Sequence, residues 1–185
     1  MSAFLFAFIA VLLSGIGARD QITVASLTRC NGPNIGLLVI ACLASCATAA
    51  AAAWAGSTLA PTMTPNARNF LAALALGWAG LESLFISPGR KLQEPTRSLG
   101  AAGIVLLAHQ VTDAARFLVF AMAIAFNAPL SAALGGAAGG AAMLSAAWAA
   151  PEYFEWNALR WPRRGFGLVM LIVAIVIGGK ASGRF

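Results

Sequence analysis

Long apolar stretches, separated by short polar ones, repeat along the whole chain. An α-helix needs roughly 20 apolar residues to cross a bilayer, and the polar intervals contain turn signals such as Asn31-Gly-Pro33 and Asn127-Ala-Pro129. We therefore predict an all-α integral membrane protein with six transmembrane helices. Their expected ranges are 2–18 with a continuation to 27, 35–59, 70–86, 99–126, 130–149 and 165–179.

The first apolar stretch contains an interruption. Gly15 and Gly17 stand within it, and the charged residues Arg19 and Asp20 follow before apolar residues resume. No basic residue precedes the stretch, whereas a signal peptide begins with a basic segment. We expect a membrane helix with an interruption near residues 15–17 rather than a cleaved leader.

Two glycine pairs, Gly135-Gly136 and Gly139-Gly140, lie in the fifth stretch. Small residues at this spacing let two helix backbones approach closely in a membrane. We expect these pairs to mark tight helix crossings rather than a hinge.

The two halves of the chain resemble each other at an offset of 95 residues. At this offset Ala18 aligns with Asp113, and Arg68 aligns with Arg163. Three spans per half would make the second half enter the membrane in the opposite direction. We therefore predict two inverted three-helix repeats, at residues 1–89 and 98–185, joined by a central cytoplasmic loop at 90–97.

Composition excludes several classes of protein. Of the 185 residues, 60% are hydrophobic and 10% charged, whereas soluble domains are about 25% charged. A soluble enzyme, a disordered chain and a disulfide-stapled module are therefore excluded. Six spans leave no room for an extramembrane catalytic domain, and phosphate-loop, zinc-protease and serine-triad motifs are absent from the sequence. We expect no enzymatic activity and no cofactor.

The net charge of +6 bears on orientation. In a membrane protein such charges sit in loops and face the cytoplasm, so we expect a lipid bilayer as partner and no nucleic acid. The alternate loops on one side carry more basic residues than those on the other, which places both termini in the periplasm of a bacterial inner (plasma) membrane. The richer set is Arg29, Arg90, Lys91, Arg97, Arg160, Arg163 and Arg164, and the poorer set is Arg68, Lys180 and Arg184.

Ionisable residues within spans are costly and mark functional sites by default. In the fourth stretch, spacings of three and four residues would place Gln110, Asp113 and Arg116 on one helix face, with His109 beside them. One interpretation is a cation or proton site at Asp113, and the other is a structural ion pair between Asp113 and Arg116. His109 fits either a proton shuttle or a hydrogen-bonding group.

Arg19 and Asp20 in the first stretch are adjacent, so on a helix they project about 100° apart and pair poorly with each other. Cross-pairing with Arg116 and Asp113 is natural if the halves meet around a pseudo-twofold axis. We expect a site where the first and fourth spans meet at mid-membrane. Glu82, late in the third stretch, is a further ionisable residue.

Segments 8–21, 77–85, 105–116 and 126–130 together resemble the bacterial GDT-one-like family, small cation/proton exchangers of the LysE-type superfamily. Each of that family's two three-span repeats carries Glu-x-Gly-Asp-Lys/Arg-Ser/Thr, usually followed by Gln. In the first motif of this chain Gly17, Arg19 and Gln21 match, whereas Gly15 and Ala18 stand where the family has Glu and Asp.

The second motif keeps the family's Asp as Asp113, while Gln110 and Thr112 replace Glu and Gly. The resemblance implies exchange of a divalent cation, manganese or calcium, for protons. Asp113 and Gln110 would be the metal ligands, with Thr112 and Asp20 as further oxygen donors.

The arginines support a different substrate, because they oppose a divalent cation. Arg19 and Arg116 suit an anionic or amino-acid-like solute instead. A third interpretation is a non-transporting membrane scaffold subunit. We therefore expect a secondary transporter, with divalent cation/proton exchange as the leading activity and the other two interpretations as alternatives. The residues expected at its site are Asp113, Gln110, Thr112, Arg116, Asp20, Arg19, Gln21 and His109.

Overall fold

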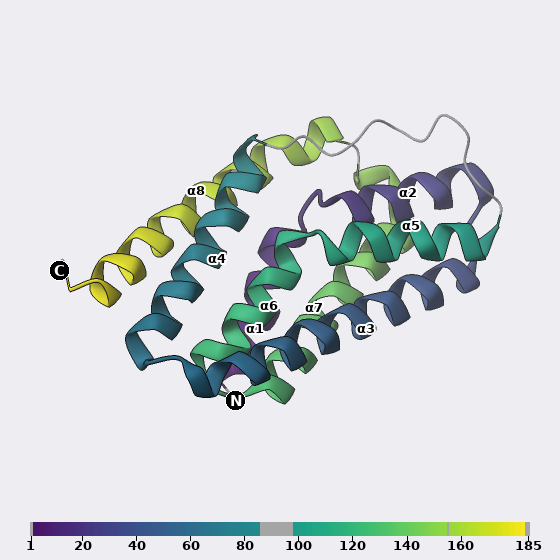
Figure 1. Ribbon diagram of the computed structural model, residues 1–185. Coiled ribbons are helices and arrows are strands. Elements are labelled where there is room, and N and C mark those ends of the chain that lie inside the picture. Colours follow the sequence, from purple (N-terminus) through teal and green to yellow (C-terminus); the bar gives the residue numbers. More distant parts are fainter. Residues whose placement is uncertain (1, 86–97, 155, 184–185) are drawn as a thin grey trace.

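A computed structural model describes residues 2–85, 98–154 and 156–183, and these residues form helices joined by short connections, without a strand (Figure 1). The predicted all-α class is confirmed. The helices are α1 (Ser2–Gly15), α2 (Arg19–Asn31), α3 (Ile35–Leu59), α4 (Pro65–Phe85), α5 (Leu99–Val111), α6 (Ala114–Ala125), α7 (Pro129–Ala149) and α8 (Trp156–Ala181), with short 3-10 turns at Ala60–Thr62 and Pro151–Tyr153.

Local sequence accounts for several helix starts. The side chain of Asn34 accepts the N–H of Gly36 at 2.8 Å and caps α3. The hydroxyl of Ser98 accepts the N–H of Ala101 at 3.4 Å and caps α5. Pro129 is the first residue of α7, where its missing N–H costs nothing.

Two expected spans are broken. α1 and α2 meet at a bend of 60° across residues 16–18, which confirms the predicted interruption, and Gly17 adopts a φ of +67° there. α5 and α6 meet at a bend of 53° at Thr112 and Asp113. The expectation of one continuous helix over 99–126 is therefore wrong.

The second break has a local cause. The hydroxyl of Thr112 donates to Ala108 O at 3.0 Å and His109 O at 3.2 Å, so it closes the last turn of α5. Such back-bonding by threonine often bends helices. Asp113 then takes extended dihedral angles (φ −82°, ψ 143°) before α6 begins.

Among the described residues, fewer helices than the six expected spans meet the length and hydropathy of a membrane span. Within the described ranges, three helices are long and apolar enough to cross a membrane, at Ile35–Thr62, Pro129–Ala149 and Trp161–Ala181, and there are up to five if each bent pair is one span. Helix α4, expected as a span, is not among them. Several apolar helices are nonetheless compatible with a multi-pass membrane protein.

Helices α4 and α8 lie side by side along one flank of the molecule, and the central helices α1, α3, α6 and α7 pack beside them (Figure 1). Helices α2 and α5 continue the broken spans beyond the two bends. The central core consists mostly of alanine with a few larger side chains such as Leu118. These contacts bring both breaks into the interior.

The glycines of α7 lie at tight crossings, as predicted. A Cβ added at Gly139 would lie 2.9 Å from the backbone oxygen of Phe8 in α1, and one at Gly135 would collide with the oxygen of Phe4. On the neighbouring face, a Cβ at Gly140 would collide with the hydroxyl of Ser45 in α3. Helix α7 therefore approaches both α1 and α3 closely.

The expected loop at 151–164 is largely helix, because α8 begins at Trp156. Arg163, expected as a loop charge that faces the cytoplasm, is instead buried with 3% of its surface exposed. The central loop 90–97 with Arg90, Lys91 and Arg97, the side chain of Arg160, and Arg184 lie outside the described residues.

Candidate functional site

The two helix breaks meet in the interior. A small cavity, with room for about one water molecule, is lined by Gly15, Asp20 and Gln21 from the first break and by Asp113, Ala115 and Arg116 from the second. The rest of the lining comes from Val11 of α1 and from Gly140, Met143 and Leu144 of α7. The first and fourth predicted spans therefore do meet at their polar residues.

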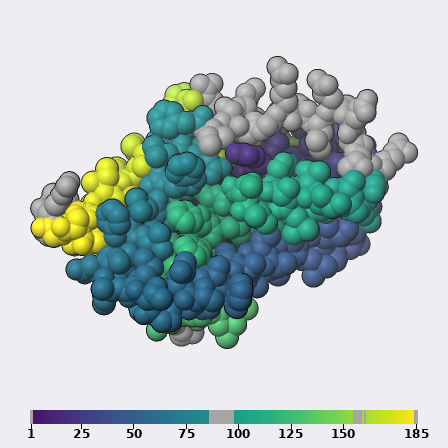
Figure 2. Space-filling view, in the orientation of Figure 1, coloured from purple at the N-terminus to yellow at the C-terminus, as the bar shows by residue number. Residues whose placement is uncertain are grey.

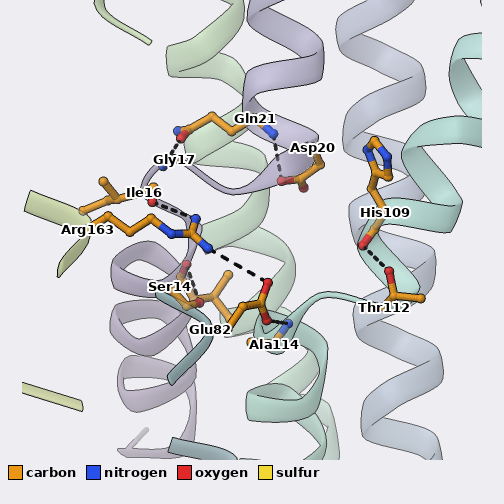
Figure 3. Close-up of polar contacts among 11 residues, drawn as sticks. Ser14, Ile16, Gly17, Asp20, Gln21, Glu82, His109, Thr112, Ala114 and Arg163 are labelled. Carbon is orange, nitrogen blue, oxygen red and sulfur yellow. Dashed lines mark hydrogen bonds and ion pairs between the residues drawn. The ribbon is translucent and has the colours of Figure 1, made fainter. Parts of the chain in front are cut away.

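The first break satisfies most of its polar groups locally. The amide oxygen of Gln21 accepts the N–H of Gly17 at 2.7 Å (Figure 3). Its Nε2 donates to Met143 O at 3.4 Å. The carboxylate of Asp20 accepts the N–H of Gln21 at 2.8 Å. Asp20 and Gln21 are both buried.

The second break uses a carboxylate from another helix. Asp113 holds the N-cap position of α6, but its side chain makes no capping hydrogen bond. Glu82 of α4 instead accepts the N–H of Ala114 at 3.2 Å. Glu82 also lies 4.0 Å from the guanidinium of Arg163, which donates to Ile16 O at 3.3 Å (Figure 3).

Arg116 is buried beside the cavity. Its Nη2 donates to the hydroxyl of Ser45 at 3.0 Å, while its Nε and Nη1 have no hydrogen-bond partner within the described part of the chain. It interacts electrostatically with Asp20 and Asp113, one acid from each break. Arg116 therefore has an acid of each half of the chain as an electrostatic partner.

Gln110 does not share a helix face with Asp113 and Arg116, because the break separates it from them. It is fully buried at the end of α5, where its Oε1 accepts from Thr48 at 3.5 Å. Its Nε2 is another buried donor without a partner among the described residues. Gln110 and Arg116 thus both face the stretch of α3 that carries Ser45 and Thr48.

Thr112 and His109, which were also expected at the site, do not line the inner cavity. Thr112 is exposed and its hydroxyl is engaged within α5. His109 is half-buried, with Nδ1 3.3 Å from the hydroxyl of Thr23, and it interacts electrostatically with Asp20 and Arg19. His109 and Asp20 come from opposite breaks and lie near each other (Figure 3).

A hollow of about 260 Å³ opens on the outer side of the second break. Asp113 and Arg116 line this hollow as well as the inner cavity, so these two side chains lie between the two spaces. Trp78, Phe117 and Phe120 supply an apolar wall. In Figure 2, α6 reaches the surface between α4 and α5 on this face.

A metal site is not assembled in the described ranges. No group of three or more His, Cys, Asp or Glu side chains there is placed to hold an ion. Asp113 interacts electrostatically with Asp20 and Glu82, but also with two guanidinium groups, those of Arg116 and Arg163.

Four buried residues were not expected at the site: Ser45, Thr48, Glu82 and Arg163. Ser45 and Thr48 are three residues apart in an alanine-rich helix, a spacing that could have indicated a polar face. Glu82 was noted as ionisable but had no partner in sequence. Nothing in the sequence pairs it with Arg163, 81 residues later.

No family model, curated protein or solved structure matches the chain.

Proposed function

We propose that the protein is a secondary transporter whose substrate site lies where the two helix breaks meet. The observation that carries the proposal is that Asp113 and Arg116 line both the inner cavity and the outer hollow. Broken helices that expose polar groups in a bundle interior are typical of transporter binding sites. In this proposal, movement of Asp113 and Arg116 at the second break connects the two spaces.

The proposed substrate is a small anionic or amino-acid-like solute. Arg116 Nε and Nη1 and Gln110 Nε2 are buried donors without partners in the described structure, and a buried donor left unpaired costs about 1–3 kcal/mol. Arg116 lines both spaces, so a carboxylate there would satisfy the guanidinium donors. Asp20 and Asp113 line the adjoining cavity and offer charge complementarity to an ammonium group.

Divalent cation/proton exchange, as in the GDT-one-like family, is the second candidate. The electrostatic interaction of Asp113 with Asp20 and Glu82 favours it. Arg116 opposes it, since a guanidinium among these carboxylates already supplies a positive charge.

We further propose that the protein contains two inverted repeats with six spans. Ala18 and Asp113, which align at the 95-residue offset, are the N-cap residues of α2 and α6. Helix α4, with 21 residues, is long enough for a sixth span. The proposed location is the inner membrane of a bacterium with both termini outside.

The test is solute flux into proteoliposomes that contain the purified protein, with an imposed proton gradient. The panel comprises manganese, calcium, small carboxylates and small amino acids. The variants are Arg116→Gln and Asp113→Asn, with the exposed residues Lys180 and Glu152 neutralised as matched controls.

The charge of the substrate determines how Arg116→Gln changes the flux. For an anionic or amino-acid-like solute, Arg116→Gln abolishes flux, whereas for a divalent cation it leaves or increases flux. Lys180→Gln and Glu152→Gln retain flux in both cases. Absence of flux for the whole panel would contradict the proposal and favour a scaffold subunit.

A further inference from the structure

Helices α4 and α8 cross so tightly that their backbones touch. A Cβ added at Gly80 would lie 2.8 Å from Gly167 O, and one at Gly167 would lie 2.9 Å from Gly80 O. Glycines at such a crossing let two helices pack as one unit. Glu82 follows Gly80 by two residues, and Arg163 precedes Gly167 by one helical turn.

The paired helices α4 and α8 contact both helix breaks through one ion pair, that of Glu82 with Arg163. Arg163 Nη1 donates to Ile16 O in the first break at 3.3 Å, and Glu82 Oε2 accepts the N–H of Ala114 in the second at 3.2 Å. Arg163 Nη2 and Glu82 Oε1 are 4.0 Å apart, with 4% and 6% of their side chains exposed. Figure 3 shows Arg163 between Ile16 and Glu82.

Stability alone is a poor reason for this arrangement. A buried ion pair often contributes no more than apolar side chains of the same volume, and an acceptor for the Ala114 N–H alone would not require Arg163 beside it. What the pair does provide is a continuous polar connection between Ile16 and Ala114, which lie on separate broken helices.

We propose that Glu82 and Arg163 are positioning residues that couple the two helix breaks, so that a change at one is transmitted to the other. The purpose of the coupling rests on the proposed transport function, because both breaks border the substrate site. The coupling itself is a property of the fold and is measurable without any substrate.

The test is the labelling rate of a buried cysteine at the second break. Ala115 has 3% of its surface exposed and lines the inner cavity, so Ala115→Cys reacts with a maleimide when the break opens. The native residues Cys30, Cys42 and Cys46 are replaced by serine or alanine. Gly17→Ala perturbs the first break, since an L side chain is strained at its φ of +67°.

We expect Gly17→Ala to change the labelling rate about threefold or more when Glu82 is present. With Glu82→Gln, which retains an acceptor for the Ala114 N–H but removes the charge, the same perturbation should have no effect. Glu152→Gln is the matched control and should preserve the response. Elution as a single species in detergent establishes that each variant is folded.

A response to Gly17→Ala that is equal in both backgrounds, including no response in either, overturns the proposal. If Gly17→Ala does not fold, Ile16→Gly perturbs the same break, and if Glu82→Gln does not fold, Arg163→Lys weakens the connection from the other side. Coupling that is lost in Glu82→Gln while no solute moves in liposomes would support this inference and contradict the proposed function.

Discussion

The two helix breaks differ in which residues provide hydrogen-bond partners for the polar groups at the break. At the first, a glycine provides the turn and the next residues of the same chain segment satisfy its polar groups, through Gln21 and Asp20. At the second, no glycine is present and the N–H of Ala114 depends on Glu82 from α4. At the first break the polar groups are satisfied mostly by residues close in sequence. The second combines the local hydrogen bonds of Thr112 with an acceptor from α4, and the Asp113 side chain makes no capping hydrogen bond there.

The largest effect is expected at Arg116, the cation of the second break that faces acids of both breaks. Arg116→Gln should lower the free energy of unfolding by about 3–5 kcal/mol, because it leaves buried carboxylates uncompensated. Adding Asp20→Asn or Asp113→Asn should restore part of this stability, because each carboxylate interacts electrostatically with Arg116. Denaturant titration in detergent micelles measures this, and no recovery in either double variant would refute the interaction.

The next largest effect is expected on proton-coupled flux when Asp113 and Asp20 are neutralised separately. Asp113→Asn should reduce proton-coupled flux by roughly 100-fold, the order expected for loss of a proton-transfer group, while the protein reaches the membrane in normal amount. Asp20→Asn should be milder because that carboxylate is already bonded to the Gln21 N–H. Wild-type flux with unchanged pH dependence in Asp113→Asn would exclude it as the coupling group.

A smaller effect is expected from loosening the first break at Gln21. Gln21→Ala should cost about 1–3 kcal/mol of stability, because the buried N–H of Gly17 loses its acceptor. Gln21→Glu retains an acceptor oxygen and serves as the comparison. Thermal unfolding in detergent, followed by circular dichroism, ranks the two; if Gln21→Glu is as harmful as Gln21→Ala, charge and not the missing acceptor is responsible.

The smallest effect is expected at Gly17. Gly17→Ala should cost about 1–2 kcal/mol, because an L side chain is strained at a φ of +67°. Gly165→Ala is a suitable control, since a Cβ there meets no neighbouring atom within 4 Å. A Gly17→Ala protein as stable as the Gly165→Ala protein would show that the first break tolerates an ordinary backbone.

The contrast between the breaks also explains what could be predicted from sequence. Gly15 and Gly17 indicated the first break, and the glycine pairs of α7 indicated its close crossings, because glycine carries a local signal. Thr112 and Asp113 are compatible with a helix, so the second break was missed. The Glu82–Arg163 pair depends on the packing of α4 against α8, which no local pattern encodes, and the charge of Arg163 was assigned to a loop.

The glycine face of α7 has a consequence for mutational tolerance. The hydroxyl of Ser45, with which a methyl group at Gly140 would collide, is the partner of Arg116. An alanine methyl group at Gly140 would therefore displace the Ser45–Arg116 hydrogen bond, although α7 itself carries no charged residue. In a saturation screen, Gly140 should be as intolerant as Arg116. Intolerance at this position would mark the close helix crossing that keeps the Ser45–Arg116 hydrogen bond in place.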